Sequence, residues 1–398
     1  MPARALSRTL AAEGAPRGGL AALCITQTTA WGILYYALIA AVGPISQDTG
    51  WDPALVTGAF SAGLLVSAAA GIAVGRLLDR TGPRRVMLAG SVVGVLALLL
   101  VAAAPSLPVF LAAWLLAGTA QAAVLYQPAF TVISRWYGPA RIRPLTVLTL
   151  VAGFASTIFA PATAALSAAF GWRGAFTILA GLLGLVTVPL HARYLNRTWS
   201  PAAETRAEEQ PTAARAIRRS RDFISLQALM ALLGLALYNV TLSIIPLLME
   251  KGADYTTATL GLGCIGAGQV AGRLVFAAIP AGTRLPATAA AAAFSILLLA
   301  FLPGPVPVLI AAGTLAGAVR GCQTLLQATL VAERWGTANL GALQGAFAAP
   351  LTAVAALAPV AGTAVAAWFG TYTAMAWAMV AAAVTAAAAA AVDWRRTG

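Results

Sequence analysis

Charged residues are scarce in this chain: they make up 9% of its 398 residues, whereas 60% are apolar. A soluble globular protein carries roughly 25% charged residues, so this composition excludes a protein whose whole surface faces water. Apolar stretches long enough to cross a hydrocarbon core of roughly 30 Å recur along the chain. We expect twelve membrane-spanning helices, over residues 20–44, 54–78, 85–104, 107–134, 144–169, 173–195, 223–249, 256–280, 286–303, 306–331, 339–363 and 369–392.

Cysteine and histidine are also rare. The three cysteines fall inside expected spans and His191 is the only histidine, so neither a disulfide framework nor a metal site is expected. The sequence shows no nucleophile–base set and no phosphate-cradling loop, so we expect neither an enzyme nor a bound cofactor. The apolar stretch after Arg17 is too long for the core of a signal peptide, and we expect it to remain as the first helix.

The net charge of +13 is unevenly distributed, and the distribution indicates membrane topology rather than nucleic-acid binding. Basic residues gather in the N-terminal tail and in alternate loops, most densely between Arg193 and Arg221, whereas the opposite loops hold only Arg173 and Lys251. An excess of Lys and Arg marks cytoplasmic loops, so both termini are expected in the cytoplasm. The arginine- and alanine-rich composition points to a bacterial inner membrane, with the lipid bilayer as partner and no nucleic acid.

The chain divides into two similar halves. Residues 196–222 are hydrophilic and predict a flexible cytoplasmic linker between six-helix bundles at 20–195 and 223–392, with cytoplasmic tails at 1–19 and 393–398. A constant offset of 199 residues relates Leu116-Ala117-Gly118 to Leu315-Ala316-Gly317, Arg135-Trp136 to Arg334-Trp335, and Phe170-Gly171 to Phe369-Gly370. Such an offset is typical of an internal repeat. We therefore expect an all-α membrane protein whose two bundles are related by a pseudo-two-fold axis, with a substrate site between them.

A basic motif ends the second expected helix: Gly75-Arg76-Leu77-Leu78-Asp79-Arg80-Thr81-Gly82-Pro83-Arg84-Arg85. From the residues alone, Gly75 permits close helix approach, and Asp79 can cap a neighbouring helix or pair with an arginine such as Arg135. The string resembles the G-x-x-x-D-R-x-G-x-R signature of the major facilitator superfamily. The resemblance implies rocker-switch transport, with a role in the cytoplasmic gate for Gly75, Asp79, Arg80, Gly82 and Arg84. The second half departs from the signature, because Ala281 stands where an aspartate would.

Further stretches resemble the bacterial monocarboxylate-transporter and oxalate:formate-antiporter branch of that superfamily. They are Trp31-Gly32-Ile33-Leu34-Tyr35-Tyr36, Gly50-Trp51, Gly153 through Pro161, Gly171-Trp172-Arg173 and Gly268-Gln269-Val270-Ala271-Gly272-Arg273. This resemblance implies that Arg273 binds a substrate carboxylate. The sequence lacks the helix 11 lysine of oxalate carriers, and Gln269 stands where eukaryotic monocarboxylate carriers have an aspartate. The first departure argues against a dicarboxylate substrate unless Arg320 supplies the second charge, and the second argues against proton coupling through this position.

Arg273 and Arg320 are the arginines expected deep in the membrane. A charge there costs on the order of 2.5–3.5 kcal/mol and usually marks function, although a guanidinium can also bind neighbouring carbonyls. Gln323 and Gln327 continue a polar stripe from Arg320, and Gln269 lies one turn before Arg273. No acid is expected at such depth, which favours an anionic substrate. Interhelical packing is as plausible as substrate contact for the remaining candidates, Gln27, Tyr35, Tyr36, Gln121, Tyr126, Tyr238 and Asn239.

The sequence thus predicts a monomeric carrier of a small organic anion, a monocarboxylate, with protons or a counter-transported anion as coupling partner where there is one. An exporter of amphipathic drugs or metabolites is the alternative, and a large aromatic cavity would favour it. A transceptor, which binds a ligand and signals without moving it, is a third reading.

Overall fold

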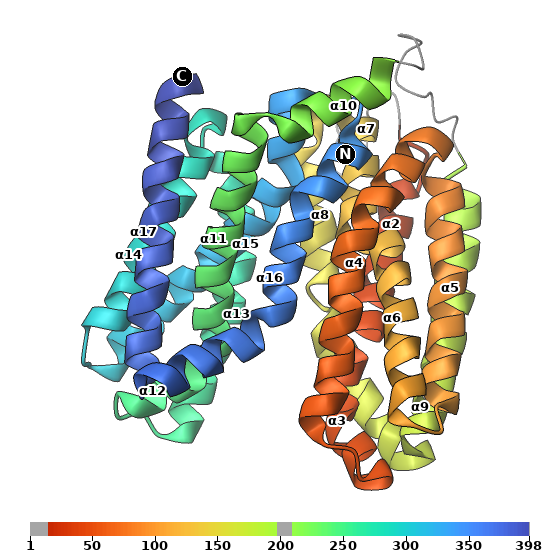
Figure 1. Cartoon of the computed structure of the whole chain (residues 1–398), viewed down its shortest axis with the longest axis horizontal. Helices are drawn as coiled ribbons and strands as arrows, with labels where there is room; N and C mark the ends of the chain where they lie inside the picture. Colours follow the sequence, from red (N-terminus) through yellow and green to blue (C-terminus); the bar gives the residue numbers. More distant parts are fainter. Residues whose placement is uncertain (1–14, 197–208, 398) are drawn as a thin grey trace, which may run out of the picture. The chain divides into compact units, whose positions relative to one another are not determined.

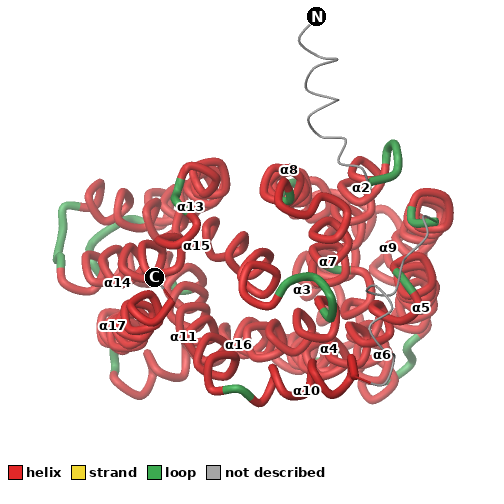
Figure 2. Tube along the Cα trace, turned by 90° about the horizontal axis from the view of Figure 1, so that it is seen from above, coloured by secondary structure: helices red, strands yellow, loops and turns green. Residues whose placement is uncertain are grey.

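The structure, a computed structural model, describes residues 15–196 and 209–397, and these residues form helices joined by turns, with no strand among them (Figure 2). Within them, eleven helical segments are long and apolar enough to cross a membrane. One of the eleven, Ile142–Tyr194, has 53 residues. At about 1.5 Å per residue it measures about 80 Å, more than twice the hydrocarbon thickness. Because its path breaks at Gly171, it supplies two spans, which makes the twelve expected.

Contacts group the chain into two units, and the first holds the described residues up to Ala216 together with Val331–Thr352. Its α4, α5 and α6 lie side by side (Figure 1). The helices before Ala216 are α2 (Gly19–Trp31), α3 (Ala37–Thr49), α4 (Pro53–Thr81), α5 (Pro83–Ala103), α6 (Leu107–Val124), α7 (Tyr126–Tyr137), α8 (Ile142–Ala152) and α9 (Ala155–Tyr194).

The second unit holds residues 217–330 and the chain after Thr352, and in it α17 packs on α11 and α14. Two long helices, α15 and α16, pass from one unit into the other, and α10 lies across the boundary at Ala216. The helices after residue 208 are α10 (Glu209–Arg219), α11 (Arg221–Leu242), α12 (Ile244–Glu250), α13 (Tyr255–Val275), α14 (Arg284–Phe301), α15 (Val306–Trp335), α16 (Leu340–Phe369) and α17 (Tyr372–Thr397).

Helix boundaries follow signals in the local sequence. The Asp52 side chain accepts a hydrogen bond from the Ala54 N–H at 2.7 Å and so caps α4. Gly82 ends that helix with φ +82°, and Pro83 begins α5, where its missing N–H costs nothing. The proline that departs from the superfamily signature is therefore the first residue of the third span.

Three membrane spans are irregular near their middle. The first contains a π-helical turn at Gly32–Tyr36, between α2 and α3. The fourth is interrupted at Leu125, whose ψ of −159° separates α6 from α7. The seventh is interrupted at Ser243, between α11 and α12. Such irregularities leave backbone groups outside the regular helical pattern and frequently occur at functional sites.

The expected linker is partly helical in the structure. Glu209–Arg219 forms α10, because alanine and arginine favour helix, and Ser220 then caps α11 through the Phe223 N–H at 3.2 Å. Residues 197–208 of the expected linker lie outside the described part of the chain. The limits proposed for the bundles and tails remain predictions.

Gly171 tests the division of the long segment into two spans. Its φ of +66° and ψ of 165° belong to a region that side chains rarely enter, at a cost of roughly 1–3 kcal/mol. We expect Gly171→Ala to lower the thermal unfolding midpoint of the purified protein. Gly181→Ala is the control, since that glycine lies in regular helix and a Cβ there meets open space. Equal midpoints for the two variants would contradict the assignment of the turn to Gly171.

Candidate functional site

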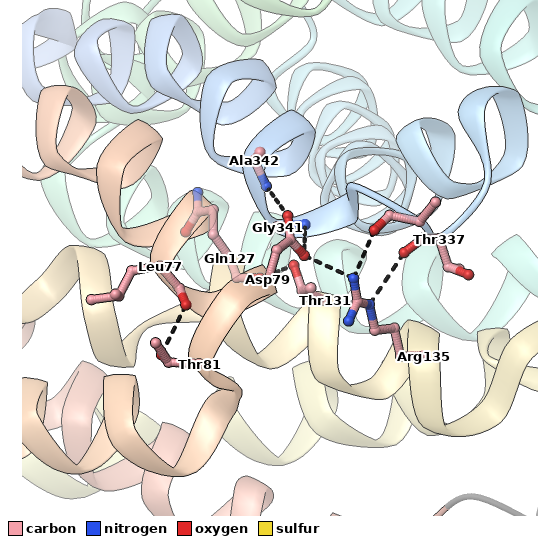
Figure 3. Close-up of polar contacts among 10 residues, drawn as sticks. Leu77, Asp79, Thr81, Gln127, Thr131, Arg135, Thr337, Gly341 and Ala342 are labelled. Carbon is pink, nitrogen blue, oxygen red and sulfur yellow. Dashed lines mark hydrogen bonds and ion pairs between the residues drawn. The ribbon is translucent and has the colours of Figure 1, made fainter. Parts of the chain in front are cut away.

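The carboxylate of Asp79 lies at the N-terminus of α16. Its Oδ1 accepts a hydrogen bond from the Gly341 N–H at 3.0 Å, and its Oδ2 accepts one from the Ala342 N–H at 2.7 Å (Figure 3). These N–H groups belong to the first turn of the helix, where no intrahelical carbonyl is available to them. A negative charge here also complements the positive end of the helix dipole. Asp79 therefore caps a helix 262 residues away in sequence.

Arg135 from α7 completes this cluster, which we call the latch (Asp79, Arg135, Gly341 and Ala342). Its Nη2 is 2.9 Å from Asp79 Oδ1, and both side chains are 12% exposed. The same guanidinium donates to the carbonyls of Thr337 and Ala338, at 3.2 and 2.9 Å (Figure 3). The pair thus fixes the turn before α16 as well as its first turn. Both contacts that the sequence predicts for Asp79, a helix cap and an arginine, are present.

Below the latch, α4 and α16 touch backbone to backbone. A Cβ added at Gly75 would overlap the Gly341 carbonyl oxygen, one at Gly341 would lie 2.5 Å from the Gly75 oxygen, and one at Gly345 would overlap the Gly71 oxygen. Each helix therefore contributes two glycines four residues apart, the small-xxx-small pattern that lets membrane helices approach closely. Gly75 was predictable from the motif, but Gly71, Gly341 and Gly345 were missed, although this spacing could have revealed them.

The other motif residues lie around the latch rather than in it. Gly82 is buried and turns the chain between α4 and α5, while Arg80 and Arg84 are exposed. The arginine that pairs with Asp79 comes from α7, so the motif supplies the acid and another span supplies the base. These contacts also account for the place of Val331–Thr352 in the first unit, although sequence assigns those residues to the second bundle.

In the second unit, α13 and α15 cross through a second set of glycines. A Cβ at Gly272 would overlap the Ala318 oxygen, and one at Gly321 would overlap the Gln269 oxygen and lie 3.2 Å from the Arg273 nitrogen. The Cys322 thiol donates to the Gly272 carbonyl at 3.3 Å. Because Arg273 follows Gly272 and Arg320 precedes Gly321, this crossing places the two arginines on facing turns. Arg273 is 8% exposed.

Arg320 is half-buried, and its guanidinium carbon lies 4.2 Å from the ring centroid of Tyr238 on α11. In the described residues no carboxylate lies within 4.0 Å of this guanidinium. A cation–π contact satisfies a cation less completely than an ion pair and leaves its N–H groups able to donate. The structure therefore brings the predicted residues Arg320, Tyr238 and Arg273 into one region of the second unit.

The predicted glutamines and Asn239 of the second unit differ in burial and in hydrogen bonding. Gln269 and Gln327 are half-buried, whereas Gln323 is 3% exposed and its Nε2 lies 3.5 Å from the Met230 oxygen. Asn239 is 1% exposed and donates to the Leu235 carbonyl at 2.8 Å, one turn before the break at Ser243. Its amide nitrogen therefore bonds within its own helix, α11.

Gln27 and Gln121 link the first and fourth spans. The Gln27 amide donates to the Val124 carbonyl, and the Gln121 amide donates to the Leu34 carbonyl at 2.8 Å. Val124 directly precedes the break in the fourth span and Leu34 lies in the π-helical turn, so both amides satisfy carbonyls at irregular backbone. Both side chains are fully buried. This geometry gives their nitrogens an interhelical role, and substrate contact for them remains a prediction.

The predicted tyrosines of the first unit gather around Trp31, whose ring centroid lies 5.1 Å from that of Tyr35 and 4.7 Å from that of Tyr126. Tyr35 also lies 5.1 Å from Tyr36 and from Phe60. Trp31, Tyr35, Tyr36 and Tyr126 are all half-buried. Trp31 was missed as a site candidate, although its place one turn before Tyr35 is a signal for a shared helix face.

These features define the class of protein: a multi-pass helical membrane protein built for transport. Two crystal structures share its fold, both at 15% identity and both covering 94% of this chain and 98% of the other. One is a Major Facilitator Superfamily transporter, FucP, in the outward conformation, with a TM-score of 0.71. The other is a variant of the E. coli fucose:proton symporter FucP, with a TM-score of 0.69.

A family model of the Major Facilitator Superfamily matches residues 23–305, and the chain belongs to this superfamily. The predicted fold class and family are thereby confirmed, and a member of this transporter family is not an enzyme. Monocarboxylate transporter 11 is 36% identical in Mus musculus and 34% identical in Homo sapiens, over 146 residues that are 36% of this chain. The match spans only 30% and 28% of the length of these relatives.

The close approach of α4 and α16 can be tested by comparing the stability of alanine variants at Gly75 and Gly71. Gly75→Ala adds a methyl group that overlaps the Gly341 carbonyl, so α4 and α16 must separate. We expect the free energy of unfolding to fall by about 1–3 kcal/mol, as at other overpacked sites. Gly71→Ala is the matched control, because its Cβ would lie 3.8 Å from the Gly345 oxygen, an ordinary contact. Thermal unfolding midpoints measure the difference. Equal midpoints would show that α4 and α16 do not depend on this close approach.

Proposed function

We propose that the chain transports a small organic anion, in the first instance a monocarboxylate, by alternating access. Its proposed setting is a bacterial inner membrane, with both termini in the cytoplasm and the protein working as a monomer. The resemblance of residues 268–273 to monocarboxylate carriers and the similarity to monocarboxylate transporter 11 support the substrate class. The similarity to monocarboxylate transporter 11 covers about a third of this chain.

The observation that carries the proposal is the cationic region of the second unit. Arg320 lies on the Tyr238 ring with no carboxylate within 4.0 Å in the described residues, and Arg273 lies on the facing turn of α13. A guanidinium binds a carboxylate through two parallel hydrogen bonds. In a medium of low dielectric constant such a contact is stronger than in water. We assign the substrate carboxylate to Arg273, with Arg320 as the second cation.

The acids of the described chain support an anion as cargo. Asp79 and Glu333 each lie two residues from a helix end, and Asp393 lies four residues from the end of α17. The others lie at caps, in first turns or in last turns, so none stands in the middle of a span. A cationic substrate would have no carboxylate in the middle of a described span to pair with, and a transported proton would have to travel on the substrate itself or be replaced by a counter-transported anion.

The aromatic cluster of the first unit favours the alternative, an exporter of amphipathic compounds. Four half-buried aromatic side chains, Trp31, Tyr35, Tyr36 and Tyr126, are grouped at the two irregular helices. Flat apolar surfaces of this kind suit the apolar part of a ligand. Flux in proteoliposomes against a panel of labelled carboxylates separates the two functions, and binding without flux would instead support a transceptor.

The latch is proposed as the cytoplasmic gate, engaged in this structure. Asp79→Asn removes the charge that Arg135 and the α16 N-terminus share, so we expect slower transport and a larger inward-open population. Labelling of introduced cysteines from the cytoplasmic side should rise severalfold while expression is maintained. Breaking a buried ion pair costs about 3–5 kcal/mol because one charge is left unpaired.

A double variant controls for that unpaired charge. Asp79→Asn combined with Arg135→Gln removes both charges, and its defect should be smaller than the sum of the two single defects. Unchanged labelling and flux in Asp79→Asn would remove the gate assignment. Additive single effects would mean that the two residues act separately.

Arg273 is the decisive position for the substrate. Arg273→Ala should weaken carboxylate binding by about 2–5 kcal/mol, as truncating one member of a buried charge pair does. Arg273→Lys should restore only part of the affinity, since an ammonium lacks the planar fork. Arg320→Ala should impair dicarboxylates more than monocarboxylates if it is a second clamp, and should instead lower the folded yield if it is structural. Binding is measured on purified protein with a parallel thermal melt.

Arg284 provides the matched control for these arginine variants. It is 6% exposed, donates to the Ile279 carbonyl at 2.9 Å and lies over the Phe276 ring. Arg284→Gln should therefore reduce stability and leave the affinity of the folded fraction unchanged. A well-folded Arg273→Ala variant with normal carboxylate binding and flux would refute the anion carrier and favour the exporter.

A further inference from the structure

The end of α3 lies beside the beginning of α4, whereas the latch lies at the other end of α4 (Figure 1). Charged side chains at the end of α3 join three helices. Asp48, in the last turn of α3, accepts hydrogen bonds through Oδ2 from Trp172 Nε1 at 2.8 Å and Arg173 Nη1 at 2.6 Å. Both donors directly follow the break at Gly171. Arg173 Nη2 also donates to the Ala104 carbonyl, at the C-terminus of α5, at 3.2 Å. One acid and one base thus connect the tip of α3, the second part of α9 and the end of α5.

The second unit has the same connection made from different residues. Glu250, the last residue of α12, accepts hydrogen bonds from the Tyr372 and Thr373 N–H groups of α17 at 2.6 and 3.1 Å. Lys251 donates to the Ala300 and Leu302 carbonyls at the end of α14, at 3.2 and 2.5 Å. Burial raises the pKa of Glu250, but hydrogen bonds from Thr373 and Tyr372 and the charge of Lys251 lower it by more, so the carboxylate is ionised at neutral pH.

We call these two groups the clasps: Asp48 with Trp172 and Arg173, and Glu250 with Lys251 and α17. The repeat relates them, because Arg173 and Tyr372 are 199 residues apart, the offset of the repeated motifs. Arg173 and Lys251 are also the two cations that sequence places on this side of the membrane. Each clasp unites corresponding spans (the first, third and sixth, and the seventh, ninth and twelfth) although the cation comes from a different span in each.

Each clasp holds a helix tip that is separated from the rest of its span. The π-helical turn at Gly32–Tyr36 precedes α3, and the break at Ser243 precedes α12. Bending concentrates at such interruptions, where the regular ladder of helix hydrogen bonds is broken. A tip beyond a hinge needs contacts of its own to keep its position, and the clasps supply contacts to two other helices.

We propose that α3 and α12 are hinged tips, that each clasp holds its tip against its own unit, and that opening a clasp frees the tip to swing without unfolding the unit. This rests on the hinges and the charged contacts, and it does not depend on which substrate the transporter carries. The device is built twice, once in each repeat.

Hydrogen–deuterium exchange on the full-length protein in lipid nanodiscs tests the proposal. Asp48→Asn should speed exchange about tenfold in residues 37–49, and Glu250→Gln should do so in residues 244–250 and at the Tyr372 and Thr373 amides, since charge-assisted hydrogen bonds are lost. Exchange in α5 and α14 should stay unchanged.

The same loops offer matched controls. Asp52 and Asp254 cap their own helices, through the Ala54 N–H at 2.7 Å and the Thr257 N–H at 3.1 Å, and within residues 15–196 and 209–397 neither binds a distant helix. Asp52→Asn and Asp254→Asn should therefore leave the α3 and α12 tips protected. If Asp48→Asn folds poorly, Arg173→Gln keeps the bond from Trp172 to Asp48 and should raise exchange at the same tip more mildly. Exchange that is unchanged, that matches the controls, or that rises across a whole unit would overturn the proposal.

Discussion

The backbone groups at helix ends are the constraint on which the charged contacts of this protein depend. Inside or near a membrane little water is available to satisfy them, and the chain has few charges. Asp79 caps α16 and Glu250 caps α17, while Lys251 and Arg173 bind carbonyls that end α14 and α5. These four charges thus bind backbone groups where helices begin and end.

Close backbone approach is the second constraint. Lipid tails are as apolar as leucine, so membrane helices gain little from burying apolar side chains against one another and depend on packing instead. Gly118 lets α6 reach the Gly63 carbonyl of α4, and Gly317 lets α15 reach the Ile265 carbonyl of α13. These two glycines belong to the Leu-Ala-Gly matches of the repeat. The repeated motif therefore has the same physical role in each half, because it permits the second and fourth spans to touch.

The spans were predictable because hydropathy is a local property, and the turns at Gly171 and Gly370 were visible as a repeated Phe-Gly pair. The two contacts of Asp79, a helix N-terminus and an arginine, were also predictable from elementary electrostatics. The interhelical bonds of Gln27 and Gln121 did not, because they depend on irregular backbone 87 to 97 residues away. The aromatic grouping around Trp31 depends on the π-helical turn in the same way. The helical part of the linker was missed because its polar composition resembles that of flexible segments.

The latch and the clasps differ in what they connect, and the difference suits a transporter. Each clasp connects helices within one repeat. Asp48 and Glu250 lie 122 to 125 positions from the residues that donate hydrogen bonds to them. The latch connects α4 to the beginning of α16, 262 positions away, through one carboxylate and one guanidinium. The gate proposed for the latch has to open often, so its bonds have to be few and have to exchange with water at modest cost. The glycine crossing beneath the latch shares this reversibility, since the contacts it makes are individually weak dispersion contacts that leave no unpaired charge when α4 and α16 part.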